Sequence, residues 1–86
     1  MGNLVVEEHA LKHGLSKEQI LYAWGNFVMR QNRSSPNEDQ IVVIGYDRTG
    51  RPLQIIAADK PFGLLIYHAM TPPTKKILRE LGLLRK

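Results

Sequence analysis

The stretch that decides the fold is Gly63-Leu64-Leu65-Ile66-Tyr67-His68-Ala69, which is followed by Met70-Thr71-Pro72-Pro73 and then by a segment rich in lysine and arginine. The apolar run is typical of a strand. At about 100° per residue, the next segment forms a helix with Ile77, Leu78, Leu81 and Leu84 on one side and Lys75, Lys76 and Arg79 on the other. The sequence therefore predicts a strand followed by an amphipathic helix, with Thr71 as its N-cap and Pro72 in its first turn.

Two further strands precede this run. Residues 41–46 are rich in β-branched side chains, and residues 53–58 form a second such segment, with Pro52 at its entry. The connection Asp47-Arg48-Thr49-Gly50 is a tight turn. Short connections favour antiparallel pairing, because parallel strands need long crossovers. We therefore expect a three-stranded antiparallel meander over residues 41–46, 53–58 and 64–69.

The N-terminal half has helical patterns. Residues 4–13 are typical of a short helix that ends at Gly14. Ser16-Lys17-Glu18-Gln19 fits a capping box, and a helical stripe follows at Ile20, Leu21, Ala23, Trp24, Phe27 and Val28. Residues 31–39 contain turn-forming residues and are expected to form an exposed loop. The stripe predicts that Trp24 and Phe27 belong to the core.

Residues 1–86 are expected to form one domain, since a chain of 86 residues needs nearly all of its hydrophobic segments for a single core. The predicted order is helix, helix, three strands, helix. A three-stranded sheet needs helices on at least one face. The expected fold is therefore α+β and two-layered, with two N-terminal helices, an antiparallel meander and a C-terminal helix.

Composition limits the class of protein. The chain has no cysteine, which excludes disulfides and thiolate metal sites, so nothing points to an oxidising compartment. No apolar stretch has the length of a membrane span. Glu7 and Glu8 follow closely on the first hydrophobic residues, unlike in a signal peptide. We expect a cytoplasmic protein without membrane association.

The net charge of +4 is unevenly distributed. Residues 71–86 contain basic side chains and a single acidic one, Glu80, whereas residues 1–40 are slightly acidic. Such a concentration of positive charge attracts phosphates or an acidic protein partner. On charge alone, a solvated helix face that keeps the chain soluble is the favoured interpretation.

His9 and His13 are four residues apart, a spacing at which two imidazoles on a helix reach one metal ion. Zinc usually takes three or more protein ligands, and neither Glu8 nor His68 completes a recognisable motif. We expect no metal and no cofactor.

His68 ends the apolar strand just before the basic helix. An imidazole exchanges protons near neutral pH, and neighbouring Lys and Arg residues stabilise a phosphate-centred anion. Such a set suits RNA cleavage, in which a ribose 2′-OH attacks the adjacent phosphate without a metal. The alternative is a histidine that bonds to a neighbouring carbonyl.

Arg48 and Arg51 flank the first hairpin turn, and strand alternation places Tyr46 near the same end of the sheet. An aromatic ring beside guanidinium groups can stack on an unpaired RNA base. Cross-strand packing is the alternative. The expected RNA-binding set is Tyr46, Arg48, Arg51, Tyr67 and Lys76.

Three motifs carry a resemblance to a known family: Ala10-Leu11-Lys12-His13-Gly14-Leu15-Ser16 before a helix, Val43-Ile44-Gly45-Tyr46 with Gly50-Arg51-Pro52-Leu53, and Ile66-Tyr67-His68-Ala69-Met70 before a basic helix. Together they resemble small bacterial type II toxins of the BrnT and RelE/ParE superfamily. The resemblance implies an mRNA endoribonuclease, acting on the ribosome or on free mRNA, that halts translation and is held inactive by a cognate antitoxin.

Position by position, the resemblance assigns His68 to the end of the last strand, Arg51 to a basic position after the hairpin, and Lys75, Lys76 and Arg79 to the closing helix. Relatives often carry an arginine where this chain has Thr71-Pro72-Pro73-Thr74. This departure places the nuclease activity in question.

Three functions follow as hypotheses. The first is an endoribonuclease toxin with His68, Lys75 and Arg79 as catalytic residues. The second is an interaction protein of the same fold without nuclease activity. The third is a toxin that acts on another target such as gyrase.

Overall fold

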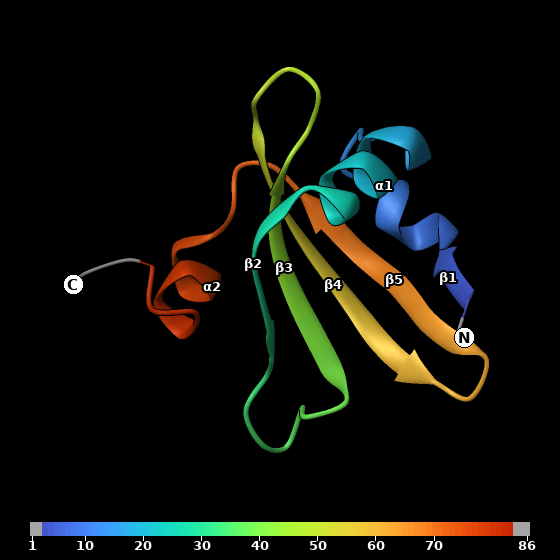
Figure 1. Ribbon diagram of the computed structural model, residues 1–86, viewed down its shortest axis with the longest axis vertical. Helices are drawn as coiled ribbons and strands as arrows, with labels where there is room; N and C mark the ends of the chain where they lie inside the picture. Colours follow the sequence, from blue (N-terminus) through green and yellow to red (C-terminus); the bar gives the residue numbers. More distant parts are fainter. Residues whose placement is uncertain (1–2, 84–86) are drawn as a thin grey trace.

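The computed structural model describes residues 3–83, which form a single α+β unit. In chain order its elements are β1 (Asn3–Val6), the 3-10 helix η1 (Glu8–Leu11), α1 (Lys17–Gly25), β2 (Phe27–Asn32), β3 (Gln40–Tyr46), β4 (Pro52–Lys60), β5 (Gly63–Met70) and α2 (Lys75–Glu80). The strands form one five-stranded sheet in the order β1-β5-β4-β3-β2 (Figure 1). Only β1 and β5 run parallel among the described strands.

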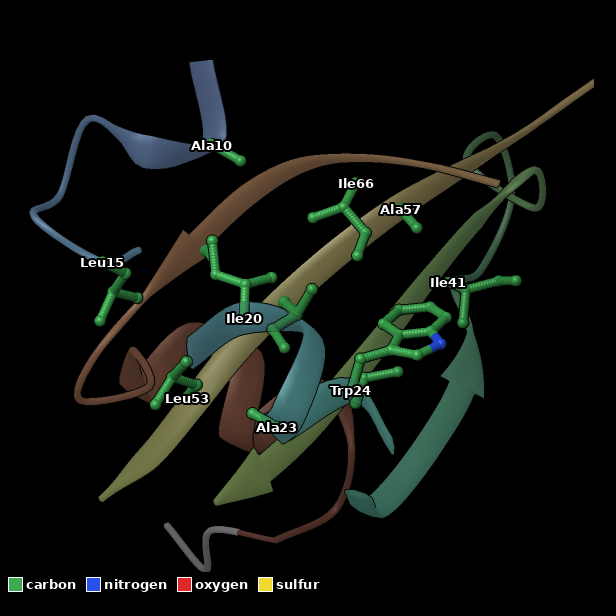
Figure 2. Close-up of a cluster of buried hydrophobic side chains, with 12 residues drawn as sticks. Ala10, Leu15, Ile20, Ala23, Trp24, Ile41, Leu53, Ala57 and Ile66 are labelled. Carbon is green, nitrogen blue, oxygen red and sulfur yellow. The ribbon is translucent and has the colours of Figure 1, made fainter. Parts of the chain in front are cut away.

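Helices cover both faces of the sheet. Successive side chains of a strand point to opposite faces, and the central strands have apolar side chains on both, so each face needs a cover. On β3, Ile41 and Val43 belong to a core beneath α1 and η1, which Figure 2 shows with Trp24 packed over the strands. Val42 and Ile44 belong to a second, smaller cluster beneath α2. In Figure 1, α1 and α2 accordingly lie on opposite sides of the sheet. The predicted two-layer arrangement is wrong for this reason.

The predicted three-stranded antiparallel meander is also wrong, because the sheet gains a strand at each edge. Residues 4–13 do not form a helix: Asn3–Val6 pairs with Gly63–Ile66, and only Glu8–Leu11 is helical. Gly63 makes this pairing possible. It has a φ of 137°, and the backbone of Asn3 occupies the space that a side chain at position 63 would need.

The second predicted helix begins where expected but ends earlier. Ser16 and Gln19 form the capping box, with reciprocal bonds of 2.8 and 3.1 Å between the backbone and side chains. The helix stops at Gly25, and the chain enters β2, which pairs with β3. Phe27 and Val28, placed by the sequence in the helical stripe, lie on this edge strand and are 46% and 62% exposed.

Gly45 on β3 fixes the distance between α1 and the sheet. A side chain there would collide with the carbonyl group of Ala23, so the glycine lets the helix backbone approach the strand directly. Ala23 is itself fully buried. This close contact positions the remainder of α1 over the core.

α2 is the basic helix expected at the C-terminal end, but its N-cap is Thr74 and not Thr71. The Thr74 hydroxyl accepts a hydrogen bond from the Ile77 amide, whereas the Thr71 hydroxyl donates to the carbonyl of Pro52 at 2.6 Å. Ile77 and Leu81 are buried in the second cluster. Leu84, which the sequence places on the same apolar side, lies outside the described residues, as do Arg85 and Lys86.

No helix within residues 3–83 combines the length and the apolar character needed to cross a membrane.

Candidate functional site

Four of the predicted site residues, Tyr46, Arg48, Arg51 and His68, lie toward one end of the sheet, the upper end in Figure 1, whereas α2 with Lys75, Lys76 and Arg79 lies to one side of the sheet. At the upper end the turn between β3 and β4 lies beside the C-terminal end of β5, because Gln54 pairs with Met70. The segment after η1 reaches the same end, since the rings of His13 and His68 lie 5.7 Å apart. The fold thus brings residues from three segments, distant in sequence, to one place.

His68 lies half-buried on β5, at an irregularity in the pairing with β4. Its Nε2 is 3.0 Å from the side-chain nitrogen of Gln54, and the side-chain oxygen of Gln54 accepts hydrogen bonds from both the backbone and the hydroxyl of Thr74. The pKa of His68 is lowered, first by burial and then by the nearby His13, Lys12 and His9. Burial and these neighbouring groups therefore favour the neutral form of the His68 imidazole.

His13 is the residue whose role the sequence did not indicate. The spacing of four residues pairs it with His9 as a potential metal ligand, whereas the structure places its ring edge-on to His68 with the two planes at 74°. His13 is exposed and Lys12 is its neighbour. The signal was absent from the sequence because 55 positions separate the two histidines along the chain. Within residues 3–83 no group of three or more potential ligands is suited to hold a metal ion.

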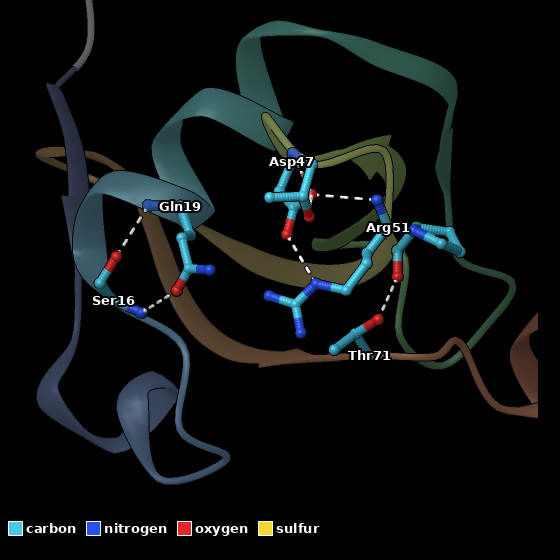
Figure 3. A network of polar contacts seen from close by, with 7 residues as sticks. Ser16, Gln19, Asp47, Arg51 and Thr71 are labelled. Atoms are coloured by element: carbon cyan, nitrogen blue, oxygen red, sulfur yellow. Dashed lines mark hydrogen bonds and ion pairs between the residues drawn. The ribbon is translucent and has the colours of Figure 1, made fainter.

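The turn between β3 and β4 is held by the buried carboxylate of Asp47 (Figure 3). One carboxylate oxygen accepts hydrogen bonds from the amide and hydroxyl of Thr49 and from the amide of Arg51, and the other accepts from the Arg51 side chain at 3.0 Å. These bonds, led by that from the Thr49 hydroxyl, lower the pKa of Asp47 to about 2. Arg51, predicted to bind RNA, therefore has its guanidinium in an ion pair that shapes the turn.

Arg48 has a different environment from Arg51. Its guanidinium carbon lies 4.4 Å from the centre of the Tyr22 ring on α1, and no ion pair forms with it among the described residues. Arg48 and Tyr22 line a pocket of about 240 Å³ together with Glu18, Gln19, Asp47 and Thr49. Tyr22 and Glu18 were missed by sequence reasoning, although their spacing of four residues places them on one helix face.

The three predicted cations of α2 are all exposed. Lys75, Lys76 and Arg79 project from the side of the helix opposite the buried Ile77. None of the three forms an ion pair within residues 3–83. They form a positively charged surface that is open to solvent.

Glu80 would be expected to offset this charge, but it is bound by Arg33. Arg33 donates two hydrogen bonds of 2.9 Å to the Glu80 carboxylate and a third to the side chain of Gln40. The hydrogen bonding lowers the pKa of Glu80 and raises that of Arg33. The ion pair is only partly exposed and joins the loop after β2 to α2.

The two predicted tyrosines have different environments. Tyr46 is 43% exposed and shares with Ile44 the face of the sheet that α2 covers. Tyr67 packs against the cluster beneath α2, and burial raises the pKa of its hydroxyl. Tyr46 is thus available to a ligand, whereas the ring of Tyr67 contributes mainly to packing.

No protein-family model, curated protein or solved structure matches this chain.

Proposed function

We propose that the protein binds single-stranded RNA on the surface formed by Lys75, Lys76 and Arg79 of α2 and by Tyr46 of β3, here called the α2 face. Exposed cations attract the phosphate backbone and account for most of the affinity of non-specific nucleic-acid binding. Tyr46 is exposed on the sheet face that α2 covers, and it offers a ring on which an unpaired base can stack. The surface thus has both components that single-strand binding uses.

The ion pair between Glu80 and Arg33 is the observation on which this proposal depends. Arg33 holds the only acidic side chain of α2 in a two-bond ion pair, so the three exposed cations face solvent without a free carboxylate beside them on the helix. A phosphate approaching α2 therefore meets three cations that are unpaired within residues 3–83, and the one carboxylate of the helix is already paired with Arg33.

Single strands fit this surface better than a duplex. α2 has six residues, a short element compared with the recognition helices that enter a DNA major groove. Tyr46 can stack only on a base that is not enclosed in a double helix. The α2 face is accordingly suited to unpaired nucleotides.

Fluorescence anisotropy with a short labelled oligouridine tests the proposal. The variant Lys75→Gln/Lys76→Gln/Arg79→Gln should bind at least about tenfold more weakly than the parent, because three phosphate contacts are lost. Lys60→Gln is the matched control, since Lys60 is an exposed cation at the opposite end of β4. Equal affinity of the triple variant and the parent would refute the proposal, as would equal weakening by Lys60→Gln.

RNA cleavage is the second candidate, and the proximity of His13 to His68 favours it. Transphosphorylation needs one group to take the proton of the 2′-OH and another to protonate the leaving 5′ oxygen. His68, whose neutral form is favoured, and the nearby exposed His13 would divide these roles, and the positive charge of Lys12 acts on the same place. Gln54 occupies Nε2 of His68, so cleavage would require that bond to open.

An endoribonuclease of this kind agrees with the resemblance to type II toxins, and the proposal then includes a cognate antitoxin as partner. Expression in bacteria, with growth and new RNA 5′ ends followed together, tests it. Growth arrest and cleavage that disappear in both His13→Ala and His68→Ala but persist in His9→Ala support the toxin. Arrest without new RNA ends rules out cleavage and indicates another target such as gyrase, while normal growth at full expression rules out a toxin.

A further inference from the structure

We propose that the pocket between α1 and the turn joining β3 to β4 binds a guanine base of the RNA strand held by the α2 face. This inference rests on the proposed function and adds a base preference to it. The pocket is lined by side chains of two elements: Glu18, Gln19 and Tyr22 from α1, and Asp47, Arg48 and Thr49 from the turn. Its volume of about 240 Å³ is below the range of drug-sized ligand sites and suits a single base.

Arg48 is the preorganised donor of this pocket. Its guanidinium carbon lies 4.4 Å from the centre of the Tyr22 ring, a contact that restricts the side chain, and within residues 3–83 the Arg48 side chain donates no hydrogen bond to another residue. The Asp47 carboxylate does not compete for these donors, because both of its oxygens already accept hydrogen bonds from Thr49 and Arg51. A ligand with two adjacent acceptors can therefore be bound by Arg48.

Glu18 is the acceptor of the pocket. Its carboxylate is exposed and has neither an ion pair nor a hydrogen bond in the described part of the chain. In particular it forms no ion pair with Arg48, although both side chains line the same small space. The pocket thus presents a negative and a positive group at separate positions.

The presence of both Arg48 and Glu18 in the pocket favours some ligands over others. A lone phosphate or carboxylate would be attracted by Arg48 but repelled by Glu18. Guanine presents two acceptors, O6 and N7, that an arginine binds with two hydrogen bonds, and its adjacent edge presents two N–H donors that a carboxylate can accept. Cytosine offers only one donor group to a carboxylate, and uracil offers no amino group. Guanine satisfies both charged groups of the pocket most fully.

The path of the chain connects this pocket with the α2 face. Tyr46 and Arg48 are two residues apart at the end of β3, and Asp47 between them is buried. A strand that stacks one base on Tyr46 can therefore continue around the end of the sheet and place a following base near Arg48. The two sites would then read neighbouring parts of one RNA molecule.

Titration of isotope-labelled protein with the four ribonucleoside 5′-monophosphates tests the assignment, because these probes share their phosphate and ribose and differ only in the base. Guanosine monophosphate should shift the amide signals of Tyr22, Arg48 and Thr49. Inosine monophosphate, which lacks the 2-amino group, should bind about tenfold more weakly, as one hydrogen bond to a charged group is lost. Equal binding of all four bases, or a preference for cytidine monophosphate, would overturn the assignment.

The variant Glu18→Gln tests whether Glu18 recognises the guanine base, as distinct from a general attraction between the basic protein and the phosphate of the nucleotide. The variant keeps the size of the side chain and should reduce guanosine monophosphate binding about tenfold, to the level of inosine monophosphate. Glu38→Gln, at an exposed glutamate in the loop after β2, is the matched control and should bind like the parent. If Glu18→Gln retains full preference for guanine, the inference fails.

The two proposals fail in different ways. Oligouridine that binds the α2 face while no nucleotide shifts the pocket signals refutes the guanine site and supports the RNA-binding function. Guanine-selective shifts without any oligouridine binding refute the RNA-binding function, and with it the assignment of the ligand as an RNA strand.

Discussion

The Nε2 atom of His68 lies 3.0 Å from the side-chain nitrogen of Gln54. The orientation of the Gln54 amide follows from its other contact, because the Thr74 backbone N–H can only donate and therefore faces the amide oxygen. The amide nitrogen must then donate to an unprotonated Nε2, so the proton of the neutral ring is on Nδ1. Since Thr74 also caps α2, the protonation state of His68 is linked to the attachment of that helix.

Protonation of His68 is predicted to destabilise the fold. The pKa of His68 in the folded protein lies below its ordinary value of 6.5, so the unfolded chain takes up the proton first as the pH falls. The stabilisation is therefore present above pH 6.5 and is lost as the pH falls through the folded pKa. His13, Lys12 and His9 oppose the positive charge of the protonated ring. The expected loss is less than about 1 kcal/mol, because the ring is only half-buried.

Urea unfolding at a series of pH values between about 7.5 and 5 measures this effect. His68→Asn keeps an acceptor for Gln54 but does not titrate in this range, so its free energy of unfolding should depend less on pH than that of the parent. The same pH dependence in the variant and the parent would show that His68 does not cause it. His9→Asn keeps the titrating ring of His68, so its free energy of unfolding should keep more of the pH dependence than that of His68→Asn.

Gly45→Ala is predicted to destabilise the protein, because the added methyl group collides with the Ala23 carbonyl on α1. Overpacking of this kind costs about 1–3 kcal/mol. Gly25→Ala is the matched comparison: nothing lies within 4 Å of the added carbon, and alanine favours a helix, so stability should be unchanged or slightly higher. Thermal unfolding of the two variants measures the difference. Equal melting temperatures would contradict the close contact between α1 and β3.

Arg33→Gln is predicted to weaken RNA binding although Arg33 is not part of the α2 face. Release of Glu80 places a free carboxylate beside Lys76 and should reduce the affinity for oligouridine about threefold at low salt. Arg33→Gln/Glu80→Gln removes that carboxylate and should restore the affinity, while Glu80→Gln alone should not weaken binding. A double variant that binds no better than Arg33→Gln would contradict this explanation. The melting temperature of each variant shows whether α2 remains attached.

The central strands and the α1 N-terminus could be predicted because their signals are local. The β-branched run at 41–46 and the capping box at Ser16 each depend on neighbouring residues. The edge strands could not be predicted in this way. Asn3–Val6 is extended because Gly63, far along the chain, leaves space for it, and Phe27 leaves the helical stripe because β3 offers a pairing edge. Tertiary pairing overrides a helical pattern in both segments.

The candidate site shows the same division between local and distant signals. The exposure of Lys75, Lys76 and Arg79 agrees with the helical periodicity of the sequence, since Ile77 and Leu81 are buried. The partners of these and other polar residues could not be read from the sequence. Arg33 with Glu80, and Gln54 with Thr74, are brought together only by the packing of α2 on the sheet.

The salt dependence of RNA affinity tests the central claim most directly. Each phosphate contact with a single strand contributes about 0.7 to the slope of log affinity against log salt. The Lys75→Gln, Lys76→Gln and Arg79→Gln variants should therefore each reduce the slope by about that amount, and Lys60→Gln should leave it unchanged. If the slope is the same in all three α2 variants as in the parent, the α2 face does not bind RNA.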